Sequence, residues 1–150
     1  AAVSKRTHES LFYALCESIG YQGVLFDAAD ENGIPVYHSN VLMCISSQFV
    51  MISMDMVAPN DRERLYSLFE QGGLAVIELN HQQIRNFCGN AIELKGKTGC
   101  LLALSLTALN ALTDSQKTII QQSHKLVPLT VSTIESAGGS VRCMIAGIHR

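Results

Sequence analysis

Two side chains in this sequence can do covalent chemistry together, the thiol of Cys143 and the imidazole of His38. A thiolate is a strong nucleophile and an imidazole transfers protons near neutral pH, so the pair is the minimum equipment for nucleophilic catalysis. Cys143 follows Gly138 and Gly139, and glycines allow the backbone to approach a planar substrate closely. Because the cysteine and the histidine are far apart in the chain, the fold must bring them together.

A repeat of about fifty residues indicates how this happens. Three similar stretches begin with the pairs Ser39-Asn40, Gly89-Asn90 and Gly139-Ser140. Each stretch continues into an apolar or alternating run that is typical of a strand. Equivalent loops of a repeat lie at the same end of the structure. We therefore expect His38, just before the first pair, to lie near Cys143, just after the third.

Each repeat unit is predicted to contain two strands, a helix and a third strand. The expected elements are a helical face of Leu11, Phe12, Leu15 and Ile19 followed by a strand at 23–27; a hairpin turning at 46–47, a helix with Asn60 as its N-cap and a strand at 74–79; and a hairpin turning at 95–98, a helix with a Thr113–Gln116 capping box and a strand at 127–135. His124 is expected on the helix of the last unit. The fold class is therefore α/β.

The chain is interpreted as one domain, residues 1–150, that contains an incomplete set of these units. The expected divisions are a partial first unit at 4–37, full units at 38–80 and 88–132, and a terminal hairpin strand at 139–150. A ring of such units needs more copies than these. We expect a missing N-terminal half or a second copy of the chain to complete it.

Composition excludes several classes of function. The sequence is 47% hydrophobic and 16% charged, as expected of a folded domain. Its net charge of −2, without a basic run, argues against nucleic acid as a partner. The apolar runs are too short to span a membrane.

The cysteines and histidines favour free thiols over structural metal sites. There are five cysteines, an odd number, and none are closely spaced, which argues against a disulfide framework and against zinc motifs. Free thiols indicate a reducing compartment, so we expect the protein in the cytoplasm. No residues stand at metal-ligand spacing, so we expect neither a metal nor another cofactor.

Each of these candidate catalytic residues also has a simpler structural explanation. A cysteine in an apolar run can be a core residue, a single histidine can be a hydrogen-bonded surface residue, and two glycines can form a tight turn. Three hypotheses stay open on the residues alone. They are a Cys–His enzyme, a binding or assembly module without catalysis, and a domain whose Cys143 is a redox thiol and whose His38 has no role.

At these residues the sequence resembles the pentein superfamily of guanidino-group-modifying enzymes. Within it, the sequence is most similar to bacterial amidinotransferase-like proteins, which include citrulline-utilisation hydrolases. The similar stretches occur in the expected order at 36–43, 74–79, 87–94, 103–117 and 133–149. The resemblance implies a five-bladed α/β propeller with an active site on its axis, of which this chain contains the C-terminal part.

The resemblance also implies a reaction. Cys143 would attack the guanidino or ureido carbon of an arginine- or citrulline-like amino acid and form a covalent thiouronium-type intermediate, which water or an amine resolves. His38 would protonate the leaving amine and later activate the water. The substrate contacts implied are Asn40, Asn90, Gly139 and Ser140. The alternative is a non-catalytic pentein-fold binding or assembly module, or an inactive fragment of the enzyme.

Overall fold

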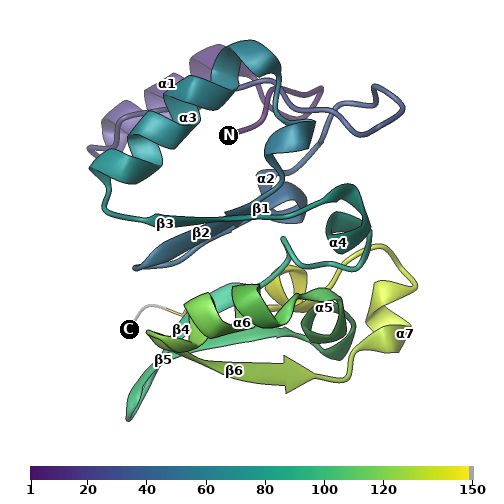
Figure 1. Ribbon diagram of the computed structural model, residues 1–150. Coiled ribbons are helices and arrows are strands. Elements are labelled where there is room, and N and C mark those ends of the chain that lie inside the picture. The colour runs from purple at the N-terminus through teal and green to yellow at the C-terminus, as the bar shows by residue number, and fades with distance from the viewer. Residues whose placement is uncertain (149–150) are drawn as a thin grey trace.

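The computed structural model describes residues 1–148 and contains two three-stranded sheets, one above the other in Figure 1. The α-helices are α1 (Glu9–Ser18), α2 (Ser39–Leu42), α3 (Pro59–Gln71), α4 (His81–Arg85), α5 (Leu106–Ala111), α6 (Asp114–Gln121) and α7 (Ser132–Glu135). The strands are β1 (Met43–Ile45), β2 (Phe49–Ile52), β3 (Ala75–Glu78), β4 (Ile92–Gly96), β5 (Gly99–Ser105) and β6 (His124–Leu129). Two 3₁₀ helices, η1 (Met54–Met56) and η2 (Val141–Met144), complete the assignment.

Both sheets have the same topology. In the first, β1 pairs antiparallel with β2, and β2 pairs parallel with β3. In the second, β4 pairs antiparallel with β5, and β5 pairs parallel with β6. The parallel pairs are connected through α3 in one sheet and through α5 and α6 in the other. The mixed α/β class and the order strand, strand, helix, strand are thus confirmed in both units.

The central strand of the first sheet separates two hydrophobic cores. Its residues are buried on both faces, and they alternate in direction as the period of a strand requires. Val50 and Ile52 belong to the core that includes Leu65 and Phe69 of α3. Figure 1 shows α1 and α3 over this face of the sheet.

The second core fills the space between the two sheets. Phe49 and Met51 of β2 contribute to it from above, and Leu102 of β5 contributes from below. Ala108 of α5 and Ile120 of α6 lie in the same core, and Figure 1 shows these helices on the side of the second sheet that faces the first. Full burial of a large apolar side chain contributes about 1.5–3 kcal/mol. This shared core fixes the loops of one unit relative to those of the next.

Of the two helix starts predicted from capping residues, one is confirmed and one is wrong. The predicted capping box at the start of α6 is confirmed, since Thr113 and Gln116 bond reciprocally to each other's backbone. The predicted start of α3 is wrong, because Ala58 rather than Asn60 is the N-cap and Pro59 occupies the first turn. Proline suits that position, where its missing N–H is not needed and its φ is already helical.

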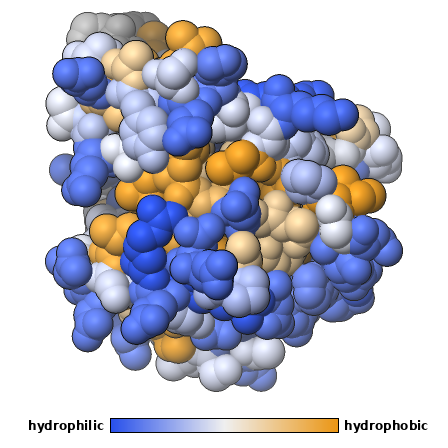
Figure 2. Space-filling model, turned by 90° about the horizontal axis from the view of Figure 1, so that it is seen from above, coloured by the Kyte–Doolittle hydropathy of each residue, from blue (hydrophilic) through white to orange (hydrophobic). Residues whose placement is uncertain are grey.

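The N-terminal segment differs from the prediction in two respects. The predicted helix forms as α1, but it buries no residue, and Leu11 and Leu15 are 68% and 59% exposed. Figure 2, which looks down on α1 and α3, shows apolar side chains gathered at the centre of this face. The strand expected at 23–27 is reduced to a single bridge between Phe26 and Ala2.

The segment around β6 is also corrected. His124 begins β6 instead of lying on the preceding helix, because α6 ends at Gln121 and His124 pairs with Cys100 of β5. The strand predicted at 127–135 is too long at its C-terminal end. It stops at Leu129, and α7 follows.

The terminal strand expected at 139–150 does not form within the described residues. Val141–Met144 is a 3₁₀ helix, because the Cys143 N–H donates to the Ser140 carbonyl oxygen rather than to a neighbouring strand. Residues 149 and 150 lie outside the described part of the chain. None of the helices between residues 1 and 148 has both the length and the hydropathy that a bilayer crossing requires.

Candidate active site

The three equivalent positions of the repeat meet at one point. The Asn90 side-chain amide donates to the backbone carbonyl oxygen of Asn40 at 2.8 Å, and its side-chain oxygen accepts from the Ser140 N–H at 3.2 Å. Asn90 is only 1% exposed, so this contact is an internal one. The loops that open the three stretches therefore lie at the same end of the structure, as the repeat predicts.

Backbone packing delivers Asn90 to this point. A Cβ atom on Gly89 would lie 2.6 Å from the Val41 carbonyl oxygen, so the loop rests directly on the backbone of α2. Phe87 adopts a left-handed conformation with φ of 64°, which non-glycine residues rarely adopt. The Asn90 N–H closes this turn by donating to the Phe87 carbonyl oxygen at 2.9 Å. Such conformations persist only where the surroundings enforce them, and they cluster at functional sites.

The thiol of Cys143 lies against the same amides. Its sulfur is 3.2 Å from Nδ2 of Asn90 and 3.6 Å from Nδ2 of Asn40. In both contacts the amide is the hydrogen-bond donor and the sulfur is the acceptor. Asn90 thus uses one amide hydrogen on the Asn40 backbone and the other on the thiol.

The glycines before Cys143 have separate structural roles. Gly138 has φ of 91°, a conformation that disfavours any residue with a side chain. Gly139 faces Cys143, since a Cβ atom there would lie 3.3 Å from Cβ of Cys143. One glycine therefore permits the turn, and the other leaves room beside the thiol.

Glu135, at the end of α7, anchors this loop and was not among the predicted site residues. Its carboxylate accepts from the Ser140 hydroxyl at 2.9 Å and from the Thr107 hydroxyl at 2.7 Å. Burial acts to raise its pKa, but hydrogen bonds from Ser105, Thr107 and Ser140 outweigh burial and hold the pKa below the usual range. The ionised carboxylate ties the Cys143 loop to α5. The sequence signal for Glu135 was an acidic residue within a run of residues that otherwise favour a strand.

His38 lies at the start of α2, two residues before Asn40. It is the N-cap of that helix, it is exposed, and its ring centroid is 4.7 Å from that of Tyr37. His38 and Asn40 line a pocket of about 260 Å³ together with Thr7. Asn40 therefore belongs both to this pocket and to the surroundings of the thiol.

The structure brings most of the predicted site residues together. Asn40, Asn90 and Ser140 are linked by hydrogen bonds to one another or to Cys143, and Gly139 packs beside the thiol. Asn90 and Ser140 are buried, and their side chains already bond within the protein. This geometry differs from the substrate contact expected of those two residues.

The remaining thiols contrast with Cys143. Cys44 and Cys88 are buried, and burial raises the pKa of each thiol to about 12. Both therefore stay protonated and unreactive at neutral pH. Cys16 and Cys100 are partly exposed, whereas Cys143 is exposed.

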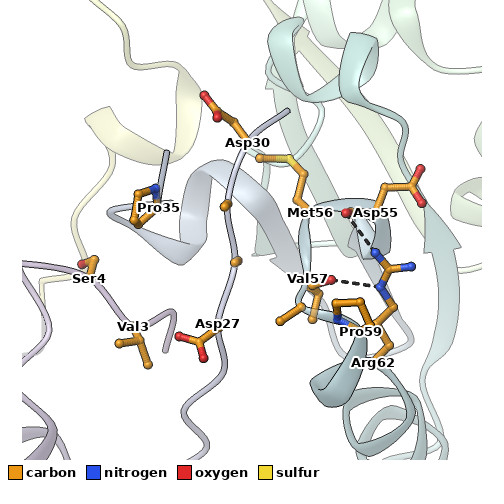
Figure 3. Close-up of a pocket in the computed structure, with 13 residues that line it drawn as sticks. Val3, Ser4, Asp27, Asp30, Pro35, Asp55, Met56, Val57, Pro59 and Arg62 are labelled. Atoms are coloured by element: carbon orange, nitrogen blue, oxygen red, sulfur yellow. Dashed lines mark hydrogen bonds between the residues drawn. The ribbon is translucent and has the colours of Figure 1, made fainter. Parts of the chain in front are cut away.

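A larger pocket, of about 460 Å³, is lined by residues of the N-terminal segment and of the corner between η1 and α3 (Figure 3). Asp27, Asp30 and Asp55 line it, and neither His38 nor Cys143 does. Its one guanidinium, that of Arg62, donates to the carbonyl oxygens of Val57 and Asp55 at 2.9 and 3.1 Å. These bonds hold the corner between η1 and α3, so we assign this pocket no part in the Cys143 chemistry.

The fold is similar to that of two proteins of known structure, ArgZ and AgrE. The N-terminal domain of ArgZ with bound product, an arginine dihydrolase from the ornithine-ammonia cycle in cyanobacteria, matches with a TM-score of 0.72 and 14% identity, over 95% of this chain and 48% of that chain. Apo ArgZ matches with a TM-score of 0.73 and 14% identity, over 95% of this chain and 21% of that chain. Unliganded AgrE matches with a TM-score of 0.71 and 14% identity, over 95% of this chain and 19% of that chain. This chain thus spans less than half of each of these structures.

The sequence itself identifies the family. Residues 1–150 match the eukaryotic N,N-dimethylarginine dimethylhydrolase family, and the chain belongs to that family. This membership confirms the predicted pentein superfamily. No curated protein sequence matches the chain significantly.

Proposed function

We propose that this protein is a Cys-dependent enzyme that acts on the guanidino or ureido carbon of an arginine- or citrulline-like amino acid. The observation that carries the proposal is an exposed thiol, Cys143, that accepts amide hydrogen bonds from Asn40 and Asn90. Family membership supports the same chemistry. The structures of ArgZ support it too, since one is described as covalently bonded to a reaction intermediate.

The reaction on a guanidino group proceeds in two steps. In the first, the Cys143 thiolate forms a C–S bond to the guanidino carbon, one C–N bond breaks, and the amine leaves with a proton from the His38 imidazolium. In the second step, neutral His38 takes one proton from a water molecule while the water oxygen adds to the guanidino carbon. The C–S bond then breaks, the thiolate is restored, and a ureido product leaves. An amine in place of this water would make the enzyme a transferase.

The neighbouring residues divide into contact and positioning roles. Asn40 lines the His38 pocket, so its amide is the group we assign to substrate contact. Asn90 and Ser140 are buried, and we assign them to holding the loops in register. Gly139 gives the thiol space to turn toward substrate.

We propose that the active form is a closed five-bladed propeller to which this chain contributes its repeat units. The chain spans 48% of the ArgZ N-terminal domain, which supports additional units supplied by an N-terminal half or by a second copy. The exposed apolar side chains of α1 and of its C-cap support it as well, because Leu11, Leu15 and Ile19 are each more than half exposed. A reducing cytoplasm fits the five free cysteines.

Alkylation by a haloacetamidine tests the nucleophile, because this reagent combines an amidinium with an electrophilic carbon. The protein is treated at neutral pH, and modification of each cysteine is followed by peptide mass spectrometry. We expect Cys143 to react faster than Cys16 and Cys100, and excess arginine or N,N-dimethylarginine to protect it. Equal rates at the three thiols would contradict the proposal. Amine release from arginine, N,N-dimethylarginine and citrulline then identifies the substrate, with Cys143→Ser and His38→Ala as inactive controls.

A further inference from the structure

A second chemical cluster lies on the second sheet and shares no residue with the Cys143 site. Glu93 of β4, Cys100 of β5 and His124 of β6 each offer one ligand atom, and these atoms all lie within 4.8 Å of one another. Carboxylate oxygen, thiolate sulfur and imidazole nitrogen are the three ligand types that zinc uses in proteins. The combination differs from a cluster of acids, which would serve only hard cations.

The strand register explains why these residues meet. His124 is directly opposite Cys100 in the parallel pair of β5 and β6. In the antiparallel pair, Lys95 is opposite Cys100 and Glu93 is opposite Leu102. Side chains two positions apart on a strand share a face, so Glu93, Cys100 and His124 all lie on one side of the sheet.

His124 is already oriented as a metal ligand would be. Its side chain is 0% exposed, and its ring meets Phe49 edge-on. Nε2 lies 2.7 Å from the Glu93 carboxylate, and Nδ1 lies 2.8 Å from the Ser123 hydroxyl. Metal-ligating histidines characteristically use their second nitrogen for a hydrogen bond that fixes the ring, and Ser123 supplies that partner.

Glu93 is held in place in the same way. Its carboxylate accepts a hydrogen bond from the Ser47 N–H at 2.6 Å, which comes from the turn between β1 and β2 of the other sheet. The contacts with Ser47 and His124 therefore fix the position of this carboxylate.

We propose that Glu93, Cys100 and His124 form a zinc-binding site. The thiolate and imidazole exclude magnesium and calcium, which prefer oxygen ligands, and the carboxylate completes three protein ligands with a fourth position open to water. Two anionic ligands balance the charge of Zn²⁺. Lys95 shares this face, but it is exposed and directs its long side chain to solvent.

Binding requires a small local adjustment. Ligand atoms around tetrahedral zinc are about 3.5 Å apart, so the Cys100 sulfur must close in from its present position and the Glu93–His124 contact must open slightly. Cys100 is partly exposed and can rotate. Cys100, Ser123 and His124 line an open pocket of about 520 Å³, which gives the ion a path inward. On binding, the Cys100 thiol proton leaves to solvent, and the single ring proton of His124 resides on Nδ1, where it donates to Ser123.

Zinc binding to the metal-free protein tests this proposal in a Cys143→Ser background, which removes the exposed thiol as a competing ligand. Titration against a coloured chelator should show one tightly bound equivalent. Cobalt(II) should give a thiolate-to-cobalt absorption band in the near ultraviolet. Zinc should also raise the thermal midpoint, because it binds the folded state and cross-links three strands.

Further substitutions in that background identify the ligands. Cys100→Ser should lose the tight equivalent and the cobalt band. Glu93→Gln, which keeps an acceptor for Ser47, should weaken binding without unfolding the protein. Cys16→Ser is the matched control, since it removes another partly exposed thiol, and it should bind zinc as the background does. An unchanged tight equivalent in the Cys100→Ser protein, with circular dichroism showing it folded, would overturn the proposal.

Discussion

Replacement of Asn90 by alanine is the most direct test of how the Cys143 site is held. The substitution leaves two backbone groups without their partner, the Ser140 N–H in a fully buried residue and the carbonyl oxygen of half-buried Asn40. An unsatisfied buried group costs about 1–3 kcal/mol, and the Asn40 group belongs at the low end because water reaches it. We therefore expect Asn90→Ala to lower the free energy of unfolding by about 2–4 kcal/mol.

Urea unfolding followed by circular dichroism measures this loss, with haloacetamidine labelling as a second readout. Labelling of Cys143 should slow because the sulfur loses its closer donor, at 3.2 Å. Asn86→Ala is the matched control in the same loop. It removes only an exposed side-chain bond to the Gln82 carbonyl oxygen, so its stability should stay within about 0.5 kcal/mol of wild type.

A third variant separates stability from thiol activation. Asn90→Asp keeps an oxygen for the Ser140 N–H but directs a carboxylate oxygen at the sulfur. Labelling of Cys143 at neutral pH should then be slower than in wild type, because the negative charge of the carboxylate opposes the thiolate that reacts with the reagent. If Asn90→Ala unfolds within 0.5 kcal/mol of wild type and labels at the wild-type rate, the role assigned to Asn90 is wrong.

Three further outcomes follow from the structure. Gly89→Ala should destabilise by about 1–3 kcal/mol, because its Cβ would lie 2.6 Å from backbone of α2; Gly72→Ala, where the nearest atoms are 3.4 Å away, is the control, and equal midpoints in urea would contradict the reasoning. Glu135→Gln should flatten the acid side of the curve of unfolding free energy against pH. A carboxylate of lowered pKa stabilises the fold above about pH 4.3 and loses that contribution as the pH falls through its folded pKa. An unchanged slope in this pH range would contradict the role of Glu135. Cys44 and Cys88 should resist iodoacetamide at neutral pH until the protein unfolds, and labelling in the native state would show that their burial is overstated.

The sequence predicted the parts of the fold that depend on local pattern. The apolar run that forms β2 and the Thr113–Gln116 capping box could both be predicted, because each depends on residues near one another in the chain. The position of His124 could not be predicted, because its strand begins where β5 offers a hydrogen-bonding partner. Pairing between distant strands has no signature in the local sequence. The Glu93–Cys100–His124 cluster was not predicted for the same reason, since strand register and not a sequence motif brings these residues together.

The candidate site was predicted through the repeat more than through single residues. Asn40, Asn90 and Ser140 were placed together by their common position in the three stretches, and they do meet. Glu135 could not be placed, because the strand expected around it is in fact α7. The hydrogen-bond partners of Glu135 are Thr107 of α5 and Ser140 of the loop that follows α7. These residues meet only in the folded chain.

The meeting of three loops around Asn90 also sets the order in which the protein matures. The bonds that hold the Cys143 sulfur join residues separated by 53 and 103 positions, so none can form before the last unit has docked on the others. Contacts of such long range are late and entropically costly. During synthesis and refolding, the amide contacts of the Cys143 sulfur therefore form only after the rest of the domain is in place.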